Sequence, residues 1–290
     1  MTVWFVGAGP GAPDLLTLRA QRLLGQASVV LYAGSLVPGE VLEATCPGAR
    51  LVDTAELDLD AITAELVAAH RDGHDVVRLH SGDPSIFSAV AEQARRLDQA
   101  GVPWRVVPGV PAFAAAAAAL GQELTLPGVG QTVVLTRTAA RATPMPAGEE
   151  LATLGATRCT LVLHLAVQHV ERVAADLLPH YGEDCPVAVV ARASWPDEVV
   201  LRCALGELAE RVRAEGIRRT AIIVVGEVLG HRGSATATCT RPPGPGSHDR
   251  EAGAGHRDRR RRPGPPDGAG DQRAQPGRRL FRDGQGRRHP

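Results

Sequence analysis

The chain has 290 residues, of which 44% are hydrophobic, so it is long enough to bury one large core or two smaller ones. Aromatic residues make up only 3%, and Ala, Val and Leu therefore carry the packing. The 32 basic residues, all Arg, balance 32 acidic ones. Because no apolar run approaches the length that crosses a bilayer, we expect no membrane partner.

The net charge of zero hides an asymmetry between two segments. Residues 1–230 hold 18 Arg against 26 Asp and Glu, a net of −8, whereas 231–290 hold 14 Arg against 6 acids, a net of +8. The second segment is rich in Gly, Pro and Arg and nearly free of aliphatic residues, which predicts a disordered tail over 231–290. A nucleic-acid-binding arm and an out-of-frame extension remain alternatives, and the acidity of 1–230 opposes a nucleic-acid partner.

The cysteines are scattered and form no CxxC pair. No signal peptide precedes the first strand pattern, so we expect free thiols in a reducing cytoplasm. No histidine lies near the cysteines in a ligand spacing, and we expect no metal site. The positions are Cys46, Cys159, Cys185, Cys203 and Cys239.

Strand and helix patterns alternate through residues 1–120. This alternation predicts a first α/β domain, 1–120, with a largely parallel sheet covered by helices. Aspartates mark the helix starts: Asp14, then Asp58 or Asp60, then Asp83 ahead of a proline. The strands are expected at 2–6, 28–32, 50–53, 75–79 and 104–107.

A break rich in Gly and Pro follows at 121–130, and a second set of elements begins after it. A short polar link that runs through Trp195, Pro196 and Asp197 is too short for a helical crossover, so the strands on either side are expected to be antiparallel. We therefore predict a second, mixed α/β domain over 121–230. Its strands are expected at 131–136, 159–164, 187–191, 198–204 and 221–225, and its helices at 167–179 and 205–215.

A glycine loop follows the first strand. Gly7, Gly9 and Ala12 satisfy the G-x-G-x-x-G/A pattern of dinucleotide-binding proteins. Pro10 and Pro13, however, remove two backbone N–H donors that would hold a pyrophosphate. The second strand also ends without the acid that would bind a ribose. An NAD(P) oxidoreductase is therefore the weaker interpretation of this loop.

Two further loops follow predicted parallel strands, where open sheets bind their ligands. The first is His80-Ser81-Gly82-Asp83-Pro84-Ser85-Ile86, in which Asp83 either caps a helix or accepts hydrogen bonds from a ligand. The second is Val107-Pro108-Gly109-Val110-Pro111-Ala112.

These loops, in this order, resemble those of the tetrapyrrole methylase family, which acts in cobalamin and sirohaem synthesis. The resemblance covers about residues 1–230. Three further segments are most similar to the branch of the family that methylates C11 of precorrin-4. They are Leu31-Tyr32-Ala33-Gly34-Ser35-Leu36-Val37, Thr136-Arg137-Thr138 and Ala193-Ser194-Trp195-Pro196-Asp197-Glu198.

The resemblance implies a two-domain α/β homodimer with its active site in the interdomain cleft. It also implies S-adenosylmethionine as the cofactor, with S-adenosylhomocysteine as its product, and a corrinoid substrate. By position, the cofactor contacts are Pro10, Ser81, Gly82, Asp83, Ile86, Pro111, Ala112, Leu165, Ala193, Thr220 and Ala221.

A corrinoid precursor carries many carboxylates, which arginine forks would bind in spite of the acidic net charge. The substrate-binding candidates are Gly9, Gly11, Arg19 and Arg137, and Arg78, Arg141 and Arg192 also lie near predicted strand or loop ends. Methyl transfer needs mainly proximity, orientation and water exclusion.

Asp14 and Asp83 are the carboxylates that could stabilise cationic character or accept a proton. The sequence leaves open whether the ring already holds cobalt. It also leaves open another methylase of the family, one acting on RNA or protein, and a corrinoid-binding module without catalysis.

Overall fold

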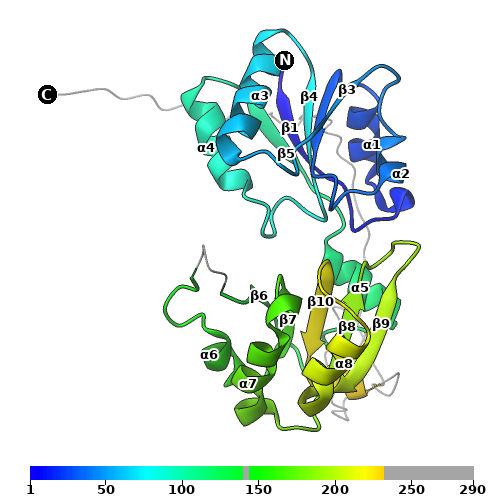
Figure 1. Cartoon of the computed structure of the whole chain (residues 1–290), viewed down its shortest axis with the longest axis vertical. Coiled ribbons are helices and arrows are strands. Elements are labelled where there is room, and N and C mark those ends of the chain that lie inside the picture. The colour runs from blue at the N-terminus through cyan, green and yellow to red at the C-terminus, as the bar shows by residue number, and fades with distance from the viewer. Residues whose placement is uncertain (140–143, 232–290) are drawn as a thin grey trace, which may run out of the picture. The chain divides into compact units, whose positions relative to one another are not determined.

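The computed structural model describes residues 1–139 and 144–231, and its described part contains two five-stranded sheets (Figure 1). Arg141 and nearly all of the predicted tail, 232–290, lie outside the described residues. The expected disorder of that tail therefore stays a prediction.

The first sheet is wholly parallel, as the alternating pattern predicts. Its strand order is β3-β2-β4-β1-β5, so β1 lies between β4 and β5. Every strand falls within one residue of its predicted position. The bounds are β1 Val3–Gly7, β2 Val29–Tyr32, β3 Arg50–Asp53, β4 Val76–His80 and β5 Trp104–Val107.

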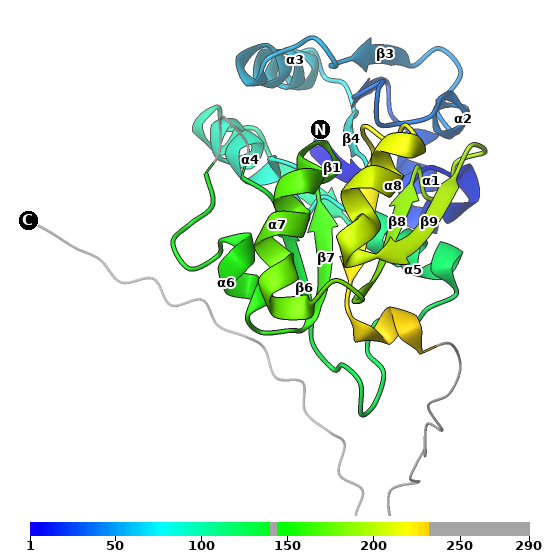
Figure 2. The same cartoon turned by 60° about the horizontal axis from the view of Figure 1, so that its bottom comes forward.

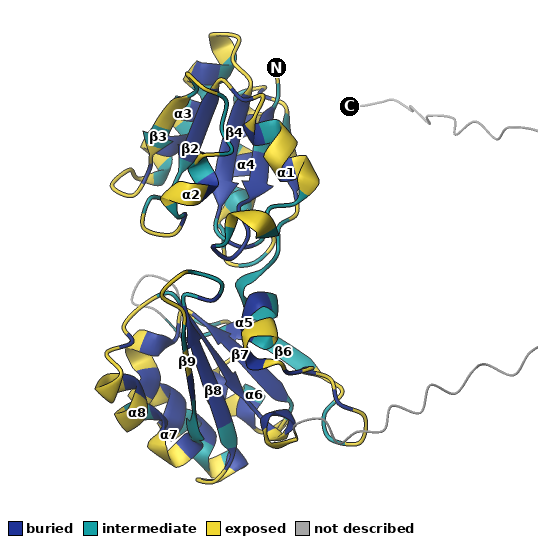
Figure 3. Cartoon of the chain, turned by 90° about the vertical axis from the view of Figure 1, so that its right-hand side faces the viewer, coloured by how far each residue is buried: buried dark blue, intermediate teal, exposed yellow. Residues whose placement is uncertain are grey.

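Helices cover both faces of this sheet (Figure 1). Apolar residues of α3, including Ile62 and Leu66, pack on one face with Leu97 of α4, and Ala20 and Leu24 of α1 pack on the other. Strands β1, β2 and β4 are largely buried, which fits their apolar sequences, whereas the edge strands β3 and β5 are mostly exposed (Figure 3). The helices are α1 Leu18–Leu24, α2 Gly39–Leu42, α3 Leu59–Arg71 and α4 Val90–Gln99.

The second sheet is mixed, with the order β6-β7-β10-β8-β9. β6 and β7 are parallel, and β10 is antiparallel to both β7 and β8. β8 and β9 form the antiparallel pair that the short link through 195–197 predicts. The strands are β6 Val133–Arg137, β7 Thr160–His164, β8 Pro186–Ala191, β9 Val199–Ala204 and β10 Ala221–Val225.

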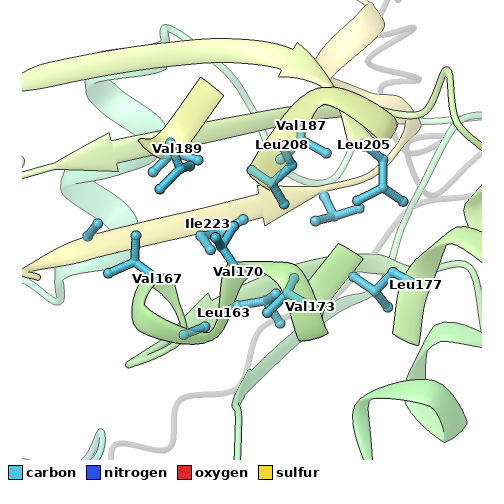
Figure 4. Packing of buried hydrophobic residues seen from close by; sticks show 14 of the residues in the cluster. Leu163, Val167, Val170, Val173, Leu177, Val187, Val189, Leu205, Leu208 and Ile223 are labelled. Atoms are coloured by element: carbon cyan, nitrogen blue, oxygen red, sulfur yellow. The ribbon is translucent and has the colours of Figure 1, made fainter. Parts of the chain in front are cut away.

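Two buried clusters hold this second sheet to its helices. Figure 4 shows the larger, where Val170, Val173 and Leu177 of α7 and Leu208 of α8 meet Ile223 of β10. Figure 2 shows α7 and α8 on the same face of the sheet. The helices are α5 Ala112–Leu120, α6 Leu151–Gly155, α7 Val170–Tyr181 and α8 Leu208–Ala214.

The helix α5 packs in the smaller cluster of the second sheet, although its residues lie at the end of the predicted first domain. Ala115, Ala116 and Leu120 are buried with Val162 and Val190 of that sheet. The alanine run 114–119 therefore forms a helix whose small side chains allow close packing on the sheet, while Ala118 and Ala119 remain exposed. The division into 1–120, 121–230 and 231–290 stays a prediction.

The prediction that Asp14 caps the first helix is wrong. Asp14 lies in a separate 3₁₀ turn, Pro13–Leu15, and α1 begins only at Leu18. The cap is Thr17, whose Oγ1 accepts a hydrogen bond from the amide of Ala20 at 3.1 Å. The backbone turns out of helical geometry after the 3₁₀ turn, with ψ of 136° at Leu16, so a continuous helix from Asp14 is impossible.

Asp83 is likewise not the cap of α4. That helix begins at Val90, because Phe87 and Ala89 adopt positive φ values of 49° and 54°, which interrupt a right-handed helix. The expected cap at Asp58 is confirmed, since its Oδ1 accepts from the amide of Ala61 at 2.8 Å. Because Asp83 does not cap α4, its side chain is available for another role.

No helix in the described ranges is long and apolar enough to span a membrane. Within the same ranges, His, Cys, Asp and Glu form no group of three that could hold a metal ion. Cys46, Cys159, Cys185 and Cys203 are free thiols, and Cys239 lies outside the described residues.

Candidate active site

Three loops meet in close backbone contact where strands β1, β4 and β5 end. A Cβ on Gly7 would lie 2.5 Å from the amide nitrogen of Gly109, and one on Gly109 would lie 2.3 Å from the carbonyl oxygen of Gly82. All of these neighbours are backbone atoms, which cannot rotate away. The glycines are therefore present because three chain segments pack against one another.

Three backbone donors of the glycine loop are already used within the protein. The amide of Ala8 donates to His80 O at 2.8 Å, and that of Gly9 donates to Gly82 O at 3.3 Å. The amide of Ala12 donates to Ser194 Oγ at 3.0 Å, and Pro10 has no N–H. These three amides face protein partners and the two prolines supply no N–H, so few backbone donors of the loop are left for a pyrophosphate, which opposes the dinucleotide interpretation.

Asp83 ties two of the three loops together. Its Oδ2 accepts a hydrogen bond from the amide of Gly109 at 2.8 Å, and its Oδ1 accepts from the amide of Ser85 at 2.8 Å and from the Ser85 hydroxyl. Burial alone would raise the pKa of Asp83, but the bonds from Ser85 and Gly109 outweigh it and hold the pKa below its ordinary value. The carboxylate is therefore ionised at neutral pH.

In the second sheet, the strand directions bring another set of loops to one edge. Because β10 is antiparallel to β7 and β8, its first residues lie beside the last residues of those strands, with Ala221 paired to Ala191. The amide of Arg192 donates to Thr220 O at 2.8 Å. The hydroxyl of Thr138, just after β6, donates to Leu165 O at 3.4 Å. The register thus places the predicted cofactor-binding residues Leu165, Ala193 and Thr220 at the same edge of the sheet.

Backbone strain is concentrated in these loops. Of the seven non-glycine residues with positive φ in the described ranges, all but Arg158 lie in the loops that follow β4, β7 and β8 or precede β10. Such conformations are unfavourable for residues with a Cβ, and they cluster at sites where geometry serves function. Leu165 combines a φ of 52° with 68% exposure, which leaves an apolar side chain available to a ligand.

Three contacts connect the loops of the two sheets. The indole Nε1 of Trp195 donates to Pro10 O at 2.9 Å, and Ser194 accepts the amide of Ala12 described above. The rings of Phe87 and His164 lie 5.2 Å apart between centroids. These contacts bring segments separated by more than 70 residues into one region, which we call the strand-end region: loops 7–14, 80–89, 108–112, 137–139, 164–166, 192–198 and 218–221.

Most of the predicted cofactor and substrate residues lie in this region, at different depths. Leu165 is exposed, and Gly9, Pro10, Gly11, Gly82, Ala193 and Ala221 are buried. The half-buried members are Ser81, Asp83, Ile86, Pro111, Ala112 and Thr220. Asp14 is exposed, and no described residue hydrogen-bonds to its carboxylate. The structure brings these residues together, and their roles stay predictions.

The arginines are less well grouped. Arg19 lies on α1 in a surface depression of about 780 Å³ that it shares with Arg22, Arg105 and Trp4, apart from the loops above. Arg137 donates to the carbonyls of Thr138 at 3.0 Å and Pro144 at 3.3 Å.

Arg78 and His80 lie side by side on β4 as buried polar side chains. Arg78 is 7% exposed and donates to Thr54 Oγ1 at 2.9 Å, while its Nε lacks a partner among the described residues. Burial lowers the pKa of Arg78 to about 10, and burial together with the Arg78 charge lowers the pKa of His80 to about 3. His80 is therefore neutral at physiological pH.

His164 is the second buried imidazole, and it predicts an acid-dependent loss of stability. Burial lowers its pKa from 6.5 to about 4, so the unfolded chain binds this proton first as the pH falls. The stabilisation is complete above pH 6.5 and is lost between pH 6.5 and about 4, on the order of 3 kcal/mol at about 1.4 kcal/mol per pH unit. Urea unfolding across this range measures it.

The matched variants for this pH prediction are His164→Leu and His74→Gln. His164→Leu should give a shallower decline below pH 6.5 than the wild type, while His74→Gln, at an exposed position, should follow the wild type. A His164→Leu protein whose stability declines as steeply as that of the wild type would contradict the assignment.

Sequence reasoning missed several residues of the region. Trp195 and Ser194 are noticed only as part of a similar segment, and their bonds to the glycine loop are invisible in the sequence. Phe87 is assigned to a helix that does not exist there. A signal for Trp195 does exist at Gly11, since a Cβ there would lie 2.1 Å from Cδ1 of the indole, but only the folded chain reveals the neighbour.

Comparison with known families and proteins agrees with this arrangement. The family model of the tetrapyrrole (corrin/porphyrin) methylases matches residues 2–209. A precorrin-4 C(11)-methyltransferase of Rhodococcus erythropolis is 58% identical over 234 residues, which cover 80% of this chain and 94% of the relative. A cobalt-precorrin-4 C(11)-methyltransferase of Methanocaldococcus jannaschii is 44% identical, over 78% and 88% of the two chains.

Solved structures give the same result. A cobalt precorrin-4 methyltransferase matches with a TM-score of 0.76 and 41% identity, over 79% of this chain and 95% of the other. A uroporphyrin-III C-methyl transferase from Thermus thermophilus, complexed with S-adenyl homocysteine, matches with a TM-score of 0.66 and 33% identity, over 79% and 99%. The family model covers more than half of the chain, and the relatives and solved structures agree with it. This chain therefore belongs to the tetrapyrrole (corrin/porphyrin) methylases.

Proposed function

We propose that this chain is an S-adenosylmethionine-dependent methyltransferase that methylates C11 of precorrin-4 in cobalamin biosynthesis. The observation that carries the proposal is the 55–58% identity to precorrin-4 C(11)-methyltransferases over more than nine-tenths of those relatives' length. The strand-end region supports it, because its exposed apolar and strained residues converge from both sheets.

S-adenosylmethionine fits the groups that the strand-end region offers. The cofactor needs an apolar surface for its adenine, acceptors for its ribose hydroxyls and ammonium, and donors for its carboxylate. Leu165 supplies an apolar side chain, and Ser81 and Asp83 supply oxygens. The first turn of α5, after Pro111, supplies backbone N–H groups that lack partners within the helix. The predicted contacts would therefore hold the cofactor through shape and backbone groups.

Methyl transfer from S-adenosylmethionine to carbon needs little general acid or base catalysis. The electron pair of the acceptor carbon forms the new bond to the methyl carbon, while the pair of the breaking carbon–sulfur bond stays on sulfur. The positive charge left on the macrocycle is relieved by loss of a pyrrole N–H proton. The protein contributes alignment and water exclusion, which account for most of the rate in such displacements.

Asp14 and Asp83 take different parts in this scheme. Asp83 is engaged by three hydrogen bonds and acts as a fixed anion that shapes the region. Asp14 does not cap α1, and its exposed carboxylate is available to accept the proton or to face cationic charge on the ring. For the substrate, Gly9 and Gly11 would line the trough while Arg19 and Arg137 would bind carboxylates.

We favour the cobalt-free substrate. The relatives named for precorrin-4 are 55–58% identical to this chain, and those named for cobalt-precorrin-4 are 41–44% identical. We further propose a homodimer in the cytoplasm without a nucleic-acid partner. Sedimentation equilibrium of the purified chain tests its assembly.

The decisive experiment is incubation with methyl-labelled S-adenosylmethionine and either precorrin-4 or its cobalt form, followed by NMR assignment of the new methyl group. We expect label at C11 of precorrin-4. Transfer to another carbon would reassign the position, and failure to transfer to either corrinoid would overturn the proposal. Nicotinamide binding without S-adenosylhomocysteine binding would instead favour the oxidoreductase.

A further inference from the structure

We propose that Trp195 is a positioning residue for methyl transfer, holding the glycine loop 7–14 in the shape that presents the corrinoid to the methyl group. This inference rests on the proposed function. It concerns a residue that contacts the loop, and it assigns to Trp195 no acid–base or nucleophilic part.

The first observation is a pair of hydrogen bonds that hold the loop from outside. Trp195 Nε1 donates to the carbonyl of Pro10 at 2.9 Å, and Ser194 Oγ accepts from the amide of Ala12 at 3.0 Å. A donor and an acceptor on neighbouring residues thus engage the two peptide groups that flank Gly11. Two directed bonds at this spacing fix the orientation of the backbone between them.

The second observation is the packing of the indole on Gly11. An ideal Cβ at Gly11 would lie 2.1 Å from Cδ1 and 2.3 Å from Nε1 of Trp195, closer than any real contact. Gly11 is buried and has no positive φ, so this glycine is required by the neighbouring ring and not by its backbone conformation. Ring and loop therefore form one complementary surface.

The third observation is that the loop carrying Trp195 is braced on its own. Arg192 Nε lies 2.8 Å from Asp197 Oδ1, and the amide of Ser194 donates to Glu198 Oε2 at 2.6 Å. The amide of Trp195 also donates to Arg192 O at 2.9 Å. Ser194 keeps a φ of 69°, an unfavourable conformation for a residue with a Cβ. Such bracing suits a rigid support for a second loop.

The glycine loop needs this support because it lacks the usual means of holding itself. Pro10 and Pro13 supply no N–H groups, and the loop leaves sheet pairing after its bridge between Gly9 and Gly82. Apart from the amide of Leu15, which donates to Ala12 O at 3.1 Å, the hydrogen bonds of residues 10–12 within the described part of the chain come from Trp195 and Ser194. A small displacement there would move the acceptor carbon out of line with the methyl group, to which displacement reactions are sensitive.

The test compares two matched substitutions. Trp195→Phe keeps a ring against Gly11 and removes the donor to Pro10. Trp104→Phe removes a similar indole hydrogen bond, from Nε1 to Asp98 Oδ1 at 2.8 Å, at a position outside the strand-end region. Turnover of precorrin-4 is measured per S-adenosylhomocysteine-binding site, which corrects for any unfolded fraction.

We expect Trp195→Phe to lower per-site kcat/KM for precorrin-4 about tenfold, the scale of one lost hydrogen bond, with S-adenosylhomocysteine affinity changed less than about twofold. Trp104→Phe should change neither quantity. Equal per-site turnover in the two variants would overturn the proposal. So would a loss of S-adenosylhomocysteine affinity as large as the loss of turnover, since that pattern indicates a general disturbance of the region.

A second measurement does not depend on activity. Hydrogen exchange of the peptide spanning residues 7–15 should be faster in Trp195→Phe and in Ser194→Ala than in the wild type, and unchanged in Trp104→Phe. Unchanged exchange in all three variants would show that Trp195 does not hold the loop. If the wild type fails to methylate precorrin-4, the proposed function falls, and the exchange experiment still decides whether the loop is held.

Discussion

Gly109→Ala is expected to lower methyl transfer at least about 100-fold and to destabilise the fold by about 3 kcal/mol. The added Cβ would lie 2.3 Å from Gly82 O and 2.8 Å from the Cα of Gly7. Both neighbours are backbone atoms of adjoining loops, so relief requires the loops to move apart. Labelled-methyl transfer and urea unfolding measure the two effects.

Gly39→Ala is the matched control for this substitution. No atom lies within 4 Å of the ideal Cβ of Gly39, and its φ is not positive. Both activity and stability should therefore remain near the wild-type values. A Gly109→Ala protein as active as Gly39→Ala would show that the loops can move apart without loss of activity. That result would contradict the assignment of the strand-end region as the active site.

Asp83→Ala is expected to weaken S-adenosylhomocysteine binding about 30-fold. The substitution removes the acceptor of the Gly109 amide and of both Ser85 donors, and bonds to a charged acceptor contribute about 1.5–3 kcal/mol each. The loop 108–112 would lose its tie to the loop 80–86, and these two loops together contain six of the eleven predicted cofactor contacts. Calorimetric titration measures the affinity.

Asp58→Ala provides the comparison for Asp83. Asp58 also accepts a hydrogen bond from a backbone amide, that of Ala61 at 2.8 Å, but it caps α3 and belongs to none of the strand-end loops. Its loss should cost about 1 kcal/mol of stability and leave the affinity for S-adenosylhomocysteine unchanged. Equal affinities in the two variants would reduce Asp83 to a local turn residue.

Much of the fold could be predicted from local patterns. Strands β3, β5 and β10 occupy their predicted residues, because turn residues on both sides limit where a short strand-forming segment can begin and end. The antiparallel β8–β9 pair follows from chain length alone, since the link 192–198 is too short for a helical crossover. The location of the candidate site in the strand-end loops could also be predicted, because ligands bind at the carboxyl edge of such sheets.

The errors share one physical cause. Asp14 and Asp83 have the local sequence of helix caps, and in both cases a backbone turn outside helical geometry intervenes before the helix begins. At Phe87 and Ala89 that turn has positive φ, a conformation that local propensity disfavours and that only surrounding contacts can impose. At these residues, tertiary packing therefore sets the backbone conformation in place of local helix propensity.

The sequence by itself determined the order of strands and helices, the family resemblance and the loops in which the site lies, because these depend on periodicity and short motifs. The tertiary structure alone decided what the glycines are for. Gly7, Gly82 and Gly109 make room for one another, and Gly11 makes room for Trp195. Such requirements join residues up to 184 positions apart, and no local pattern of hydrophobicity or propensity encodes which distant atom will fill the space beside a missing side chain.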